Sequence, residues 1–69
     1  MKTIDARTKR AVGERAASEL TGFSPSWLRQ KRQRNEGPPY LKVGRAIRYL
    51  PEDLEGYLHE HRVDTRTRA

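Results

Sequence analysis

The chain has 69 residues, no cysteine and a net charge of +6 at pH 7. Its length predicts one small domain, and its 33% content of apolar residues predicts a thin core. The lack of cysteine excludes disulfides and thiolate metal sites, and no apolar run reaches the length of a membrane span or a signal peptide. We therefore expect a cytoplasmic binding protein without a cofactor and not an enzyme, because so short a chain has little room for a substrate pocket and catalytic groups.

The positive charge is concentrated in one segment. Residues 29–48 carry a net charge of +6, equal to that of the whole chain, because they contain seven basic residues and one acid, Glu36. A basic surplus confined to one stretch predicts a positively charged face, which is typical of a nucleic-acid-binding protein. The alternative is a solvated surface without a partner, where most Lys and Arg side chains lie.

The first half of the chain predicts a helix-turn-helix. Small and apolar residues at helical spacing predict a first helix over residues 12–20, and Gly22 interrupts the pattern. Serine is a strong N-cap and proline fits the first helical position, so Ser24-Pro25 predicts the start of a second helix. We expect this helix to end near Arg34. Two helices joined by three residues that include a glycine fit a helix-turn-helix.

A β-hairpin follows the two prolines, and its register depends on the loop between its strands. A three-residue loop over residues 44–46 would put four apolar side chains on one face of the hairpin. These are Leu41, Val43, Ile47 and Tyr49. A two-residue turn at Gly44-Arg45 would instead pair Leu41 with Arg48 and put a charge on that face. We therefore expect the three-residue loop, which places Lys42 opposite Arg48 on the outer face.

A third helix follows the hairpin. Pro51 suits its first position, and Leu54, Tyr57 and Leu58 form a stripe at i, i+3 and i+4 that we expect to close the core. The helix is expected to end near His61.

The predicted fold is therefore one domain of class α+β, a small winged helix. It consists of a helix-turn-helix, a two-stranded β-hairpin wing and a C-terminal helix over residues 12–62. Residues 1–11 and 63–69 are polar and aperiodic, which predicts a flexible N-terminal arm and a flexible C-terminal tail.

A winged helix can contact double-stranded DNA through two elements. A helix fits the major groove and faces base edges, while a hairpin lies along the backbone or enters the minor groove. Arg29 and Gln30 suit base reading, because arginine pairs bidentately with guanine and glutamine with adenine. The wing suits phosphate contacts, or a narrow minor groove in the case of Arg45. The candidate DNA-binding residues are Ser24, Ser26, Arg29, Gln30, Arg32, Gln33 and Arg34 with the second helix, and Lys42, Arg45 and Arg48 on the wing.

Three segments carry a family resemblance. GFSPSWL at residues 22–28 is followed by GPPYLKVGRAIRY at residues 37–49 and EDLEGYL at residues 52–58. Together they resemble the compact winged-helix family related to the MerR DNA-binding domain, which includes AlpA-type phage regulators and excisionases. The resemblance implies double-stranded DNA binding, with the second helix in the major groove and the wing beside it.

Within that family, two roles are implied. An excisionase, or recombination directionality factor, binds tandem sites, bends DNA and biases an integrase (a tyrosine or serine recombinase) towards excision. The other role is transcription regulation. We expect the excisionase role first, because no effector domain or dimerisation helix is evident, which favours self-association side by side on repeated sites.

The sequence departs from that family at Trp27 and Lys31. Family members often carry threonine at the first position and an aromatic residue at the second. We expect the Trp27 ring to pack against the core and Lys31 to extend its ammonium outward over the ring. The alternative places Trp27 on the DNA-facing surface.

Two other classes of function stay open. One is a small adaptor that recruits a recombinase or packaging enzyme through the acidic third helix or the tails. The other is an RNA-binding protein, for which Tyr40 and Tyr49 offer a limited surface for stacking bases. His59 and His61 lie two residues apart without a partner at metal-ligand spacing, so we expect no metal site.

Overall fold

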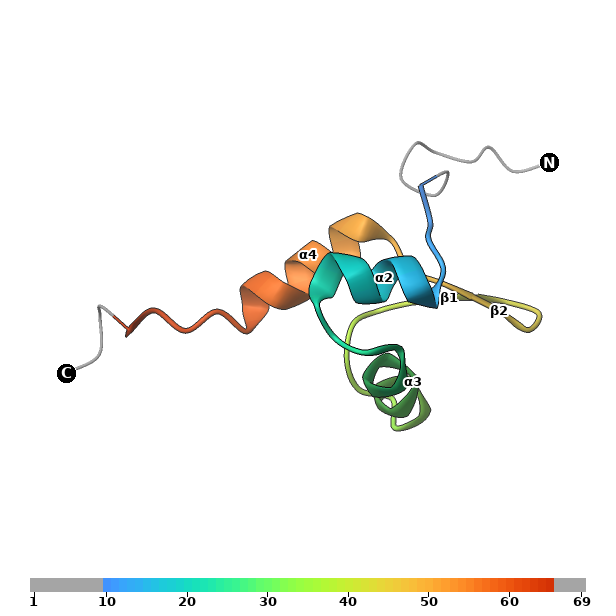
Figure 1. Cartoon of the computed structure of the whole chain (residues 1–69), viewed down its shortest axis with the longest axis horizontal. Helices are drawn as coiled ribbons and strands as arrows, with labels where there is room; N and C mark the ends of the chain where they lie inside the picture. The colour runs from blue at the N-terminus through green and yellow to red at the C-terminus, as the bar shows by residue number, and fades with distance from the viewer. Residues whose placement is uncertain (1–9, 66–69) are drawn as a thin grey trace.

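The structure of the protein, a computed structural model, describes residues 10–65. Its elements are α2 (Glu14–Thr21), α3 (Pro25–Gln33), β1 (Leu41–Val43), β2 (Ala46–Arg48) and α4 (Pro51–Glu60). α2 packs against α3 and α4, and β1 pairs with β2 in a hairpin that projects away from the helices (Figure 1). The predicted class, a small α+β winged helix, is confirmed. Most of the two predicted flexible tails, residues 1–9 and 66–69, lies outside the described residues.

The first helix begins later than predicted, because Val12 pairs with the wing and is not helical. The backbone N–H of Val12 donates to the carbonyl of Tyr49 at 2.8 Å, and the N–H of Tyr49 donates back to Val12 at 2.7 Å. Gly13 is the N-cap in an extended conformation, and α2 starts at Glu14. These two hydrogen bonds tie the chain before α2 to the base of the wing.

Local signals place the turn between α2 and α3 as predicted. Gly22 adopts the left-handed conformation, with φ of 83°, that commonly ends a helix. The hydroxyl of Ser18 donates to the carbonyl of Phe23 at 2.6 Å across the turn. The hydroxyl of Ser24 accepts from the backbone N–H of Trp27 at 3.0 Å, and a proline follows at the first helical position. The predicted N-cap is therefore confirmed.

α3 ends in a Schellman motif. The N–H of Glu36 donates to the carbonyl of Lys31 at 2.7 Å, and the N–H of Asn35 donates to the carbonyl of Arg32 at 3.1 Å. Asn35 takes the left-handed conformation that this motif needs, with φ of 57°. Gly37 is also left-handed, and a Cβ there would lie 2.8 Å from the Cβ of Lys31. The glycine that precedes the two prolines is therefore required by the end of the helix.

The predicted hairpin register is wrong, because the loop has two residues instead of three. The strands pair Leu41 with Arg48, Lys42 with Ile47 and Val43 with Ala46. The positive φ of the turn, 61°, falls on Gly44, and a two-residue turn with glycine first suits the twist of the strands. A three-residue loop would need a left-handed residue at Arg45 or Ala46, where a Cβ makes that conformation unfavourable. Turn geometry outweighs the grouping of apolar side chains, and Val43 is 73% exposed.

The core is as thin as the composition predicts. Among residues 10–65, the buried hydrophobic side chains are Ala17, Leu28, Tyr49 and Leu54, which come from α2, α3, the end of the wing and α4. Val12, Phe23, Trp27 and Ile47 pack around them and are partly buried. The predicted stripe on α4 is only partly correct, since Leu58 is exposed. Within residues 10–65, none of the helices combines the length and the apolar composition of a membrane-spanning segment.

Candidate nucleic-acid interface

The buried Leu28 sets the rotation of α3 and thereby selects its outer face. Because an α-helix has about 3.6 residues per turn, the side chains opposite Leu28 point away from the core. Five of the predicted contacts lie on or beside that face, and all are exposed: Ser26, Arg29, Gln30, Gln33 and Arg34. Besides its two arginines, the face carries hydroxyl and amide groups, which both donate and accept hydrogen bonds and therefore suit base edges.

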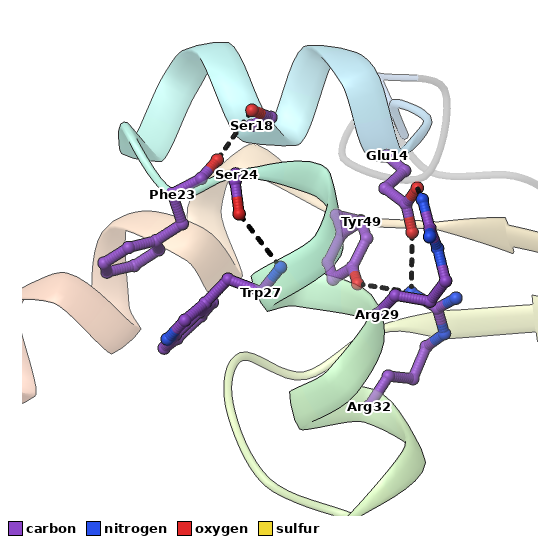
Figure 2. Close-up of polar contacts among 8 residues, drawn as sticks. All are labelled: Glu14, Ser18, Phe23, Ser24, Trp27, Arg29, Arg32 and Tyr49. Carbon is purple, nitrogen blue, oxygen red and sulfur yellow. Dashed lines mark hydrogen bonds and ion pairs between the residues drawn. The ribbon is translucent and has the colours of Figure 1, made fainter.

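Arg29 and Arg32 share an acidic partner on α2 (Figure 2). Glu14 lies in the first turn of α2, and its Oε1 accepts a hydrogen bond from Nη2 of Arg29 at 3.1 Å. Its Oε2 accepts from Nη1 of Arg32 at 3.2 Å. The same Nη1 donates to the hydroxyl of Tyr49 at 3.0 Å. One network therefore connects the core, the base of the wing and the surface of α3.

The network shifts the proton affinities of its two most enclosed charges. Burial alone would raise the pKa of the Glu14 carboxyl, but the hydrogen bonds and charges of Arg29 and Arg32 outweigh it and hold that pKa below its ordinary value. Burial would lower the pKa of Arg32, but hydrogen bonds and charge interactions with Tyr49 and Glu14 raise it above its ordinary value. Both side chains therefore stay charged at neutral pH.

Arg32 differs from the other predicted contacts in its surroundings. Its side chain is 16% exposed, against 51% for Arg29. In addition to its two hydrogen-bond partners, its guanidinium lies 5.8 Å from the centroid of the Tyr40 ring. Arg32 thus joins α3 to α2 and to the base of the wing.

The opposite flank of α3 carries an aromatic pair (Figure 2). The rings of Phe23 and Trp27 stack with their centroids 4.1 Å apart, and both pack against the core. Nζ of Lys31 lies 5.4 Å from the centroid of the Trp27 ring and 3.3 Å from Oε1 of Glu36. The predicted arrangement, with Trp27 against the core and Lys31 extended over its ring, is confirmed.

The wing carries three exposed cations that make no ion pair within residues 10–65, namely Lys42, Arg45 and Arg48. Directly paired residues share a face of a sheet, so Lys42 lies on the face of Ile47 and Arg48 on the face of Leu41. The prediction that Lys42 and Arg48 lie opposite each other is therefore wrong. The two cations flank the hairpin on its two faces, and Arg45 lies in the turn at its tip.

A comparison with known families decides how these elements are classified. Residues 15–62, which run from α2 through the wing to α4, match the family described as a helix-turn-helix domain. The chain belongs to this family. Searches of the curated proteins and of the solved structures give no significant match. Helix-turn-helix domains place their second helix in the major groove, so family and geometry together support double-stranded DNA as the partner of this helix-turn-helix protein.

Sequence reasoning missed two residues of the network. An acid in the first turn of a helix is ordinarily explained by the helix dipole, and nothing in the sequence indicates that Glu14 pairs with side chains 15 and 18 positions later. Tyr49 was expected to contribute to the apolar face of the hairpin or to a stacking surface for RNA. It is 1% exposed in the helix-turn-helix protein, so its ring is not accessible to a base.

The remaining polar candidates have local partners. Ser24 is exposed, and its hydroxyl accepts a hydrogen bond as the N-cap of α3. Nε2 of His59 lies 4.0 Å from Oε2 of Glu55, and Nδ1 of His61 lies 2.8 Å from the carbonyl oxygen of Tyr57. Over the described range, no three metal-ligating side chains come together.

Proposed function

We propose that this helix-turn-helix protein is an excisionase-like recombination directionality factor. It binds tandem sites on double-stranded DNA, bends the DNA and biases an integrase of the tyrosine or serine recombinase class towards excision. DNA binding is supported by the family. The excisionase role is supported by the resemblance of residues 37–49 and 52–58 to the MerR-related winged-helix group, which includes excisionases.

The observation that carries this proposal is the joint placement of a polar recognition face and a cationic wing. The exposed face of α3 offers hydroxyl, amide and guanidinium groups, and the wing offers three cations that make no ion pair in residues 10–65. The proposed contacts are Ser24, Ser26, Arg29, Gln30, Gln33, Arg34, Lys42, Arg45 and Arg48. Arg32 supports them by fixing α3 against the base of the wing.

Five of these contacts fall into two groups by their chemistry. Arg29 and Gln30 read base edges in the major groove, through guanine and adenine respectively. Lys42 and Arg48 contact phosphates on the two sides of the hairpin, and Arg45 contacts phosphate or a narrow minor groove. The first group sets sequence preference, and the second supplies affinity for any duplex.

A salt titration tests whether the proposed surface binds DNA. If α3 and the wing neutralise about five phosphates, log affinity should fall against log salt with a slope of about −4 to −5. A nearly flat dependence would contradict the proposed surface. Failure to retard any duplex at low salt would favour the adaptor function, and stronger competition by structured RNA than by duplex DNA would favour RNA binding.

Footprinting on the DNA that flanks the gene separates the two biological roles. Tandem protected sites near an attachment site, together with a higher yield of excised product when the protein is added to the cognate integrase, are the results we expect. One protected operator over a promoter, with no effect on excision, would instead identify an AlpA- or MerR-like transcription regulator.

A further inference from the structure

A chain of hydrogen bonds links the core of the protein to its recognition surface. It runs from the hydroxyl of Tyr49 to Arg32 at 3.0 Å, from Arg32 to Glu14 at 3.2 Å, and from Glu14 to Arg29 at 3.1 Å. Exposure rises along the same order, from the buried Tyr49 to the half-exposed Arg29. Each side chain is held by one that is more enclosed, so Arg29 is anchored to a fixed point in the core.

Glu14 is the link on which the position of Arg29 depends. One of its carboxylate oxygens bonds to Arg32 and the other to Arg29, so the carboxylate itself is held by the enclosed arginine. A guanidinium has five N–H donors, and the hydrogen bond to Glu14 leaves the others available to a ligand. An arginine that is already oriented loses less side-chain entropy on binding than one that is free in solvent.

We propose that Glu14 is a positioning residue that sets the DNA sequence specificity of the protein by holding Arg29 in place to read a base. This inference rests on the DNA binding proposed above. The base that a held guanidinium recognises best is guanine, through O6 and N7. Without Glu14, Arg29 reaches phosphates of any sequence. The surface beside α3 also loses a negative charge of α2 that weakens its general attraction to the DNA backbone.

Glu14→Gln tests the proposal, because positioning predicts that affinity for an unrelated duplex rises while the preference for the selected site falls. A preferred site is first selected from randomised duplexes with the unmodified protein, and dissociation constants are then measured for that site and for a scrambled duplex of the same composition. In E14Q, binding to the scrambled duplex should become about twofold to fivefold tighter, because a negative charge is removed. The ratio of scrambled to selected dissociation constants should fall about threefold to tenfold. A purely structural defect would weaken binding to both duplexes.

Two variants separate charge from position. Glu19→Gln makes the same change of charge on the same helix, at an exposed residue that no ion pair engages within the described residues, and should leave the ratio unchanged. Glu14→Asp keeps the charge but shortens the reach to the two arginines. It should lower the ratio with little effect on the scrambled duplex, and it tests the proposal even if E14Q does not fold.

A double-mutant cycle identifies the residue through which Glu14 acts. Arg29→Gln should lower the ratio by itself, and adding E14Q to it should lower the ratio no further. If adding E14Q to R29Q lowered the ratio as much as E14Q does alone, the role of Arg29 would be overturned. A ratio for both E14Q and E14D within twofold of the unmodified protein would overturn the inference while leaving DNA binding intact, as would a selection that yields no preferred site. Absence of any duplex binding by the unmodified protein would defeat the proposed function and this inference together.

Discussion

The cations of α3 and those of the wing have the same charge but different surroundings. On α3, most of them have acidic partners: Arg29 and Arg32 with Glu14, and Lys31 with Glu36. On the wing, Lys42, Arg45 and Arg48 make no ion pair within the described part of the chain. The basic segment therefore contains cations with an acidic partner and cations without one, and the residue types alone do not show which are which.

This difference suits the two tasks of a DNA-binding surface. Reading a base requires donors at set positions, and a guanidinium fixed by a carboxylate meets that requirement at the expense of net charge. Attraction to phosphates requires charge but tolerates motion, so exposed wing cations without an acidic partner are adequate. The comparison predicts that substitutions on the two elements will have different consequences.

The largest expected effect on stability is at Arg32. Arg32→Met should lower the free energy of unfolding by about 2 kcal/mol, because it removes the partner of the Tyr49 hydroxyl and one of the two partners of Glu14 in a largely enclosed site. Urea denaturation at neutral pH measures the loss. Arg48→Met makes the same chemical change on the exposed wing and should leave stability almost unaltered. Equal losses of stability in both variants would remove the distinction between cations that have an acidic partner and cations that have none.

The next largest effect is on affinity and belongs to the wing. Arg48→Gln should weaken binding to selected and scrambled duplexes alike by about fivefold at moderate salt, and should make the log–log salt slope less steep by about 1, because one phosphate contact is lost. Binding isotherms at four or five salt concentrations provide both numbers. A selective loss on the preferred site alone would instead place Arg48 among the residues that read bases.

The ion pairs of Glu14 predict a loss of stability in acid. The pKa of Glu14 is lowered by folding from its ordinary value of 4.5, so its contribution is fully present above about pH 4.5 and disappears as pH falls through the lower, folded-state value. The unmodified protein should be more stable than E14Q by about 1 kcal/mol at pH 6, and this difference should shrink below pH 4. Thermal melting across that range checks it. A difference that stays constant with pH would show that the charge of Glu14 does not stabilise the fold.

The smallest expected effect comes from the buried end of the network. Tyr49→Phe removes the hydroxyl that accepts from Arg32 but keeps the ring in the core, so the free energy of unfolding should fall by about 0.5 to 1 kcal/mol. Tyr40→Phe, in which the ring that lies beside Arg32 keeps its shape, is the matched control and should change stability less. A larger loss in Y40F than in Y49F would contradict the network described here.

Several local features of the fold were correctly predicted because their causes lie within a few residues. The left-handed Gly22 and the Ser24 cap define the helix-turn-helix, and a proline marks the start of α4. The packing of Trp27 and Lys31, four residues apart on one helix, was also predicted. The hairpin register was missed for a local reason too, since the prediction weighed apolar grouping above the backbone preference of Gly44.

Other features could not be predicted because they depend on how the elements cross. Val12 was assigned to the first helix, but its hydrogen bonds go to Tyr49, which is far away in the sequence. Leu58 continues the apolar stripe of α4, but its side chain is 37% exposed. In both cases the sequence pattern was compatible with the prediction, and packing decided otherwise.

By itself, the sequence determined the order of elements, the starts of α3 and α4, the thin core and the concentration of positive charge between residues 29 and 48. Only the tertiary structure decided which of those charges have an acidic partner. Glu14 is an ordinary acid at the start of a helix until the crossing of α2 and α3 brings it between Arg29 and Arg32. The physical reason is that caps and turns act over a few residues along the chain, whereas an ion pair acts across the space between elements, at separations that the sequence does not specify.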